Sequence, residues 1–177
     1  MKALTTSLGM RKPTPVQSMY IFKQPRVGGE VSAHQDSTFL HTSPVKTCLG
    51  VWVALEDCTL ENGCLWALPG SHFDGVKKRM LVERGENDDP EQGVTSFQGE
   101  YPDWLGDTNT KTKFVPLLTK AGTAVLLHGE NVHYSAPNHS AVSRHAYSVH
   151  FIDQAVSTWD DTNWMKRRDG FPFRALE

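Results

Sequence analysis

Short apolar or alternating segments recur along the whole chain, and turn residues separate them. Their β-branched and aromatic content favours strands over helices. The breaks between them, such as "RVGGE", "LENG" and "HGEN", supply Gly and Asn where the chain must reverse. The segments are "VQSMYIFK" (16–23), "LGVWVALED" (49–57), "CLWALPG" (64–70), "FVPLL" (114–118), "TAVLLHG" (123–129), "VHYSAP" (132–137) and "RHAYSVHFI" (144–152). Many short strands with close turns predict a mainly β chain, folded as a sandwich or barrel.

Two stretches depart from this rhythm. Residues 71–83, "SHFDGVKKRMLVE", have the pattern of a short helix. Residues 82–112 are acidic and glycine-rich without sustained periodicity, and they are long for a connection inside a compact domain. We interpret them as a mobile loop that edges a substrate entrance, with a tolerated surface insertion as the alternative. No repeat or low-complexity segment occurs, so the 177 residues are expected to form a single domain, 1–177.

Composition excludes several classes of function. The formal net charge is −2, and basic residues gather only in short runs at 77–79 and 166–168, so we expect no nucleic-acid partner. No apolar run reaches the length of a membrane span and no secretory signal opens the chain, so an intracellular, cytoplasmic protein is expected. Cys48, Cys58 and Cys64 lack C-x-x-C spacing and are expected to be reduced and mostly buried.

One pair of polar residues follows a strand-like stretch in a way that suggests a metal site. In "VSAHQDSTFL" (31–40), His34 and Asp36 are two residues apart, so an extended chain points both to the same face. The stretch 126–151 supplies two candidates for a third ligand, His128 before the "GEN" turn and His133 after it. Two histidines and one carboxylate on one face of an octahedral metal are the arrangement of non-haem Fe(II) oxygenases.

Two further residues fit such a site. Alternation from His133 places Ser135 on the same face, and Arg144 opens the next apolar segment. An arginine can bind a carboxylate through two parallel hydrogen bonds, and a neighbouring hydroxyl can add a third. A co-substrate that carries a carboxylate would therefore suit this group of residues.

Several longer phrases resemble one family. "VQSMYIFKQP", "HQD", "LENGCLWALPGSH", "LLHGENVHYS" and "SRHAYSVHF" are similar to motifs of the phytanoyl-CoA dioxygenase family of Fe(II)/2-oxoglutarate oxygenases. The resemblance extends over nearly the whole chain, from about residue 7 to residue 164. It implies a double-stranded β-helix, or jelly-roll, fold with few short helices.

The resemblance also implies a site and a reaction. By motif position, the iron ligands and catalytic residues are His34, Asp36 and His133, and His128 is a neighbour. The 2-oxoglutarate residues are Met19, Trp52, Ser135 and Arg144. With Fe(II) and O2, the chain would then convert the co-substrate 2-oxoglutarate to succinate and carbon dioxide. In the same reaction it would hydroxylate a small-molecule substrate, which the sequence does not identify.

The chain also departs from the family. The family normally carries a long N-terminal segment, including a lysine that helps to bind 2-oxoglutarate, and we expect the chain to be N-terminally truncated relative to that pattern. Missing strands would leave a sheet edge or an apolar face uncovered unless a partner chain covers the place of the missing segment. His72 is expected to be structural, and His139, His145 and His150 hold no motif position and are expected to have no role in the site.

Two other functions stay open at this point. A non-catalytic metal-binding β-sandwich, or an inactive truncated isoform, would keep the three ligands without turnover. A cupin-like metal hydrolase or isomerase would use the same architecture, but it would leave Arg144 and Ser135 without a role.

Overall fold

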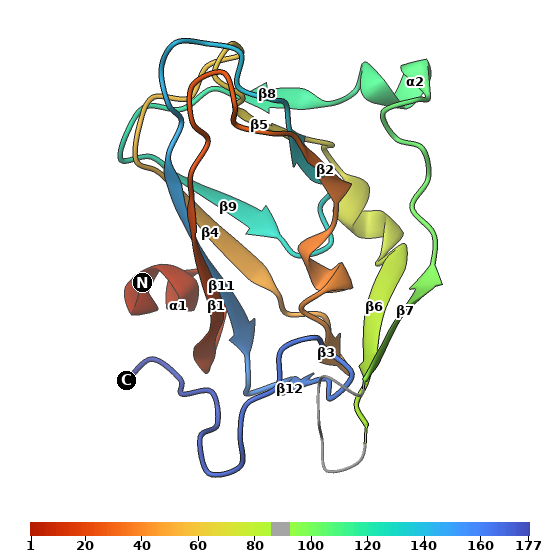
Figure 1. Cartoon of the computed structure of the whole chain (residues 1–177). Coiled ribbons are helices and arrows are strands. Elements are labelled where there is room, and N and C mark those ends of the chain that lie inside the picture. The colour runs from red at the N-terminus through yellow and green to blue at the C-terminus, as the bar shows by residue number, and fades with distance from the viewer. Residues whose placement is uncertain (86–92) are drawn as a thin grey trace.

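The computed structural model describes residues 1–85 and 93–177, and its strands form two four-stranded antiparallel sheets (Figure 1). The first sheet has the order β1-β11-β4-β9 and the second the order β2-β10-β5-β8. Their strands are β1 (Pro13–Ile21), β2 (Val31–His34), β4 (Leu49–Ala54), β5 (Leu65–Ala67), β8 (Val115–Leu117), β9 (Ala124–His128), β10 (His133–Ser135) and β11 (Ala146–Asp153). The mainly β, jelly-roll fold expected from the sequence is confirmed.

The smaller elements connect or flank these sheets. They are α1 (Lys2–Ser7), the 3-10 helices η1 (Asp36–Thr38) and η2 (Ser71–Asp74), α2 (Thr108–Lys111), and two two-stranded pairs, β3 (Thr42–Ser43) with β12 (Thr158–Trp159) and β6 (Lys78–Glu83) with β7 (Val94–Gly99). Within the described residues, none of the helices has the length and apolar character needed to cross a bilayer.

The interior between the sheets is built by alternation along the strands. In β4, Trp52 and Ala54 point inward, and both are buried. They pack in one cluster with residues of β9, β11 and β5, including Leu127, Ala146 and Leu65. Burial of a large aliphatic side chain such as Leu127 stabilises the fold by roughly 1.5–3 kcal/mol. The same alternation places polar side chains of β11 on the interior face, where they line the cavity described below.

The short helix expected over residues 71–83 is wrong for most of that stretch. Only η2 is helical, and it ends at Asp74, before Gly75, whose positive φ of 71° a glycine adopts without strain. From Lys78 the chain is extended and pairs with β7, with Lys78 opposite Gly99. Pairing with β7, which lies outside this segment, therefore favours an extended conformation and outweighs the local helix propensity.

The stretch of 82–112, expected to be an irregular loop, contains regular structure in its described part. It contributes the end of β6, all of β7 and α2, while residues 86–92 of the predicted loop lie outside the described residues. An apolar cluster around Trp104, Phe114 and Val132 anchors its second half to the sheet that contains β10. The predicted mobility of this stretch stays a prediction.

Candidate metal centre

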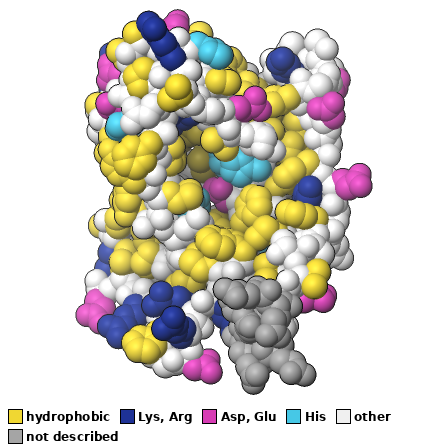
Figure 2. Space-filling view, in the orientation of Figure 1, with side chains coloured by type: hydrophobic (Ala, Val, Ile, Leu, Met, Phe, Trp, Pro, Cys, Tyr) yellow, Lys and Arg dark blue, Asp and Glu magenta, His cyan; other side chains and the backbone are white. Residues whose placement is uncertain are grey.

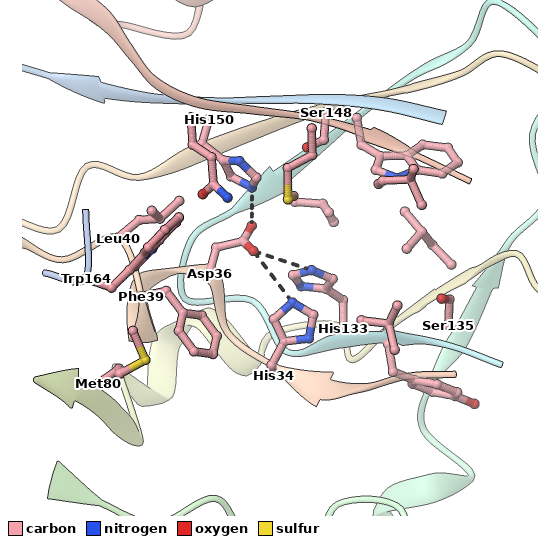
Figure 3. A pocket seen from close by; sticks show the side chains of 18 of the residues that line it. His34, Asp36, Phe39, Leu40, Met80, His133, Ser135, Ser148, His150 and Trp164 are labelled. Atoms are coloured by element: carbon pink, nitrogen blue, oxygen red, sulfur yellow. Dashed lines mark ion pairs between the residues drawn. The ribbon is translucent and has the colours of Figure 1, made fainter. Parts of the chain in front are cut away.

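Three potential ligands meet where β2 pairs with β10. His34 is the last residue of β2, His133 is the first residue of β10, and the two are direct partners across the antiparallel ladder. Asp36 opens η1 two residues after His34. One possible ligand atom from each of the three residues lies within 4.8 Å of the other two (Figure 3). The fold therefore brings the three side chains to one point.

A backbone carbonyl two residues earlier fixes the ring of each histidine. Nδ1 of His34 lies 2.7 Å from the carbonyl oxygen of Ser32, and Nδ1 of His133 lies 3.0 Å from that of Asn131. Because a carbonyl can only accept, each Nδ1 must carry the hydrogen. In the neutral ring Nε2 is then the nitrogen with the free lone pair, and in both residues it is the atom that faces Asp36. Metal-binding histidines are commonly held in this way by an outer hydrogen bond.

The two carboxylate oxygens of Asp36 face different partners. Oδ1 lies 3.7 Å from Nε2 of His34 and 3.7 Å from Nε2 of His133, whereas Oδ2 lies 3.3 Å from Nε2 of His150. Burial acts to raise the pKa of Asp36, but the three imidazoles, with His133 the largest contributor, outweigh burial and hold this pKa below its usual range. Burial, and next the neighbouring His133, lower the pKa of His34. An ionised carboxylate and neutral imidazoles are the forms that bind a divalent metal.

Arg144 presents unused hydrogen-bond donors to the same cavity. Its side chain is 1% exposed, its Nε donates to the Gly63 carbonyl at 3.0 Å, and its Nη2 donates to Oγ of Ser135 at 3.3 Å. Nη1 is buried and has no hydrogen-bond partner among the described residues. The guanidinium carbon lies 5.4 Å from the ring centre of Trp52. A buried guanidinium with free N–H groups is suited to bind a carboxylate.

A glycine and a buried lysine hold the backbone that carries this arginine site. Gly63 has a φ of 80°, and a Cβ added there would lie 2.5 Å from the carbonyl oxygen of Ala136, so only glycine allows this close approach. Nζ of Lys23 donates to the carbonyls of Gly29 and Ala136, both at 2.7 Å. Burial, and next the charge of Arg144, lower the pKa of Lys23 to about 8.

One cavity of about 520 Å³ is lined by both the triad and Arg144. Figure 2 shows the hollow in the middle of the molecule, with histidine and acidic side chains visible inside a largely hydrophobic rim. Its walls come from both sheets. The polar part of the lining consists of the triad, His150, Arg144, Gln17 and two serines. Most of the rest is apolar and includes Phe39, Leu40, Met80, Leu127 and Trp164. Such walls limit water near the metal position.

Comparison with known proteins decides the family. The sequence profile described as Phytanoyl-CoA dioxygenase (PhyH) matches residues 2–146. The chain belongs to the phytanoyl-CoA dioxygenase family. It is 50% identical over 175 residues to phytanoyl-CoA dioxygenase domain-containing protein 1 of Mus musculus, covering 99% of this chain and 57% of that protein. It is 48% identical over 166 residues to phytanoyl-CoA dioxygenase 1 of Oryza sativa subsp. japonica, covering 94% of this chain and 54% of that protein.

Solved structures agree on the fold of this family member. The α-ketoglutarate-dependent epimerase SnoN from nogalamycin biosynthesis aligns with a TM-score of 0.66 at 21% identity, over 99% of this chain and 66% of that chain. EvdO2 from Micromonospora carbonacea var. aurantiaca, solved with 2-oxoglutarate, aligns with a TM-score of 0.58 at 24% identity, over 88% of this chain and 59% of that chain. The chain thus spans little more than half the length of the curated relatives named above.

The residues implied by the family motifs gather in the cavity. All seven line it: Met19, His34, Asp36, Trp52, His133, Ser135 and Arg144. Met19 is at the rim, 38% exposed. His128, the other candidate for the third ligand, is exposed, and its Nδ1 accepts the backbone N–H of Glu130 at 3.2 Å. Its ring packs against His72, with ring centres 5.2 Å apart.

Several polar residues of the cavity were not expected from the sequence, among them Gln17, Ser148 and His150. His150 was assigned no role, yet it contacts Asp36. A usable signal was present, because alternation back along β11 places His150 on the same face as Ser148 and Ala146. Arg144 precedes this strand by two residues, so every second residue counted from Arg144 is expected to point into the interior.

Proposed function

We propose that this chain is an Fe(II)- and 2-oxoglutarate-dependent dioxygenase that couples decarboxylation of the keto acid to hydroxylation of a small-molecule substrate. One observation carries the proposal. A two-histidine, one-carboxylate group and a buried arginine with an unpartnered Nη1 line a single cavity. The metal ligands alone would fit many reactions, whereas the arginine adds a site for a second carboxylate.

The residues present fit the metal. His34 and His133 offer unprotonated Nε2 atoms, and Asp36 offers Oδ1 between them. Two nitrogens and one oxygen on one face suit Fe(II) with three open positions. Bound Fe(II), together with 2-oxoglutarate and O2, would supply the oxidising power for attack on a C–H bond.

The other end of the cavity fits the co-substrate. Nη1 of Arg144 and Oγ of Ser135 would bind the distal carboxylate of 2-oxoglutarate, and Trp52 would support the guanidinium from the side. Charge-assisted hydrogen bonds of this kind are about twice as strong as neutral ones. The apolar walls would keep water away and hold the substrate near the metal position.

The competing functions make different predictions about ligand binding. A metal hydrolase or isomerase on this fold has no use for the spare N–H groups of Arg144. A metal-binding β-sandwich without turnover keeps the binding of metal and 2-oxoglutarate but produces no succinate. The chain covers 57% of the length of its mouse relative, so turnover by this chain must be measured separately from binding.

An anaerobic titration tests the proposal. Fe(II) is added to the protein with and without 2-oxoglutarate, and the visible absorption is recorded. The expected result is a metal-to-ligand charge-transfer band that needs both components and is lost in Arg144→Ala. Admission of O2 should then yield succinate. Metal binding without any band would contradict the co-substrate assignment, and a band without succinate would support the non-catalytic alternative.

A further inference from the structure

His150 lies against the carboxylate of Asp36, and its side chain has no other polar partner among residues 1–85 and 93–177. Its side chain is 4% exposed, and its Nε2 lies 3.3 Å from Oδ2 of Asp36. Its Nδ1 is buried without a hydrogen-bond partner among the described residues. In Figure 3 the ring approaches Asp36 from the side opposite to His34 and His133. The carboxylate is therefore held between the two histidines and this third ring.

The partner of each nitrogen separates His150 from the two candidate ligands. In His34 and His133 the Nδ1 hydrogen is donated to a carbonyl, which leaves Nε2 free for a metal. In His150, Nε2 is the nitrogen that faces Oδ2 of Asp36, whereas Nδ1 faces no polar partner among the described residues. At 3.3 Å the two atoms form an ion-pair contact, and Oδ2 has no aligned hydrogen bond from any described residue. A carboxylate oxygen can only accept, so Nε2 is the nitrogen placed to donate to Asp36, and a protonated Nε2 cannot bind a metal.

A glycine in the neighbouring strand β4 leaves space for the contact between His150 and Asp36. A Cβ added to Gly50 of β4 would lie 3.3 Å from Oδ2 of Asp36 and 3.5 Å from both Cδ2 and Nε2 of His150. Gly50 is also the direct ladder partner of His150. The contact between His150 and Asp36 thus occupies a space that a larger residue in β4 would narrow.

We infer that His150 is a positioning residue that holds Oδ2 of Asp36 and so restricts this carboxylate to a single metal bond through Oδ1. The inference rests on the proposed function. Two histidines and one oxygen leave three of six positions open, whereas a carboxylate that bound through both oxygens would leave two. A 2-keto acid takes two positions, so a second oxygen from Asp36 would leave none for O2. His150 preserves the open position.

The test uses Co(II) as the probe, because its visible spectrum reports coordination number without turnover. Affinity for Co(II), and then for 2-oxoglutarate, is measured for the wild type, His150→Phe and His150→Gln. In His150→Phe we expect Co(II) affinity to fall about 10- to 100-fold, as for other outer-partner losses, with a changed spectrum. His150→Gln keeps an N–H donor and should recover most of the affinity and the original spectrum.

Two further variants separate positioning from packing. Val149→Ala alters the same strand on the opposite face and should leave Co(II) affinity and spectrum unchanged. Gly50→Ala removes no donor but crowds Oδ2, and it should change the spectrum in the same direction as His150→Phe. Thermal melts without metal check that each variant is folded.

Each outcome decides the inference. Wild-type affinity and spectrum in His150→Phe would overturn it, and so would equal losses in His150→Phe and His150→Gln, which would mean that only the ring's volume matters. If the wild type binds Co(II) but gains no affinity for 2-oxoglutarate, the proposed co-substrate is wrong while the comparison of spectra still tests His150. If the wild type binds no Co(II), both the proposed function and the inference fail.

Discussion

At the scale of single residues, hydrogen bonds of the ring nitrogens distinguish ligands from neighbours. His34 and His133 each direct a free Nε2 at Asp36, whereas His128 lies at the surface and uses Nδ1 to accept a backbone N–H. We therefore predict that His34→Ala, Asp36→Ala and His133→Ala each abolish tight Fe(II) binding. Loss of a ligand should lower the affinity for Fe(II) by more than the roughly 10- to 100-fold that loss of an outer hydrogen-bond partner typically causes.

Anaerobic calorimetry measures this, with His128→Ala as the control that keeps its affinity. In the reverse pattern, His128→Ala loses iron and His133→Ala keeps it. That result would mean that the third ligand is His128, on the other side of the turn at residues 129–131.

Arg144 should affect the co-substrate far more than the metal. Its guanidinium is buried and donates hydrogen bonds to Gly63 and Ser135, and in the described part of the chain it makes no hydrogen bond to His34, Asp36 or His133. In Arg144→Ala we predict that 2-oxoglutarate affinity falls about a hundredfold, on the order of 3 kcal/mol, because a desolvated carboxylate loses its charged partner. Arg144→Lys should recover only part, since an ammonium cannot form two parallel bonds.

Calorimetry with Mn(II) in place of iron compares the three proteins. Unchanged 2-oxoglutarate affinity in Arg144→Ala would refute the assignment, and an equal loss of metal affinity would indicate misfolding instead.

The residues of the site were predictable from sequence to different degrees. His34 and Asp36 share a strand face, which alternation alone predicts, but the choice of His133 over His128 came from the family motif. His150 was missed because a histidine in an apolar strand carries no motif of its own. Its partner, Asp36, lies in η1 and is far away in sequence. Strand alternation therefore places His150 on the interior face, but only the folded structure shows its contact with Asp36.

At the scale of elements, the hairpin of β6 and β7 has little support from neighbouring strands. All six residues of β7 are exposed, and the two strands pair only with each other among the described strands. We predict that amides of β7 exchange with solvent much faster than those of β4 and β11, which are central in their sheet.

Hydrogen exchange of the metal-free protein, read by mass spectrometry, measures this. Uniform protection across residues 93–112 comparable to that of β4 would contradict both this prediction and the mobility expected from the sequence. The backbone bond from Val82 to Thr162 should make β6 the slower strand of the pair.

Strand prediction succeeded where burial leaves a pattern in the sequence. All seven apolar segments correspond to strands, from β1 to β11, and six of these strands, all except β8, contain buried residues. Strand prediction failed for β6 and β7. All of β7 is exposed and five of the six residues of β6 are half-buried, so neither strand shows alternation, and a local run such as "KKRMLVE" is equally compatible with a helix.

At the scale of the whole molecule, buried His41 links stability to pH. Burial first, and then the positive charges of Arg79 and Lys46, lower the pKa of His41 to about 4, against the opposing charge of Asp160. Between that pKa and the ordinary value of 6.5, the unfolded chain binds a proton that the folded chain does not. Stability contributed by this group is therefore complete above that window and is lost as pH falls through it.

We predict that His41→Gln, which does not titrate, loses less thermal stability than the wild type between pH 7 and pH 4. For a chain of this size, each kcal/mol corresponds to roughly 2–4 °C in Tm. Parallel melting curves of the two proteins would refute the prediction, and melts above pH 7 give the baseline difference that the substitution itself causes.

The direct pairing of His34 with His133 across β2 and β10 has a consequence for the folding pathway. These residues are far apart in the chain, so their strands meet only after a large loop has closed, a slow step that local contacts do not assist. A cation held by both strands would act as a reversible cross-link that forms late. It should therefore lengthen the lifetime of the folded protein by slowing unfolding, and leave the rate of folding nearly unchanged.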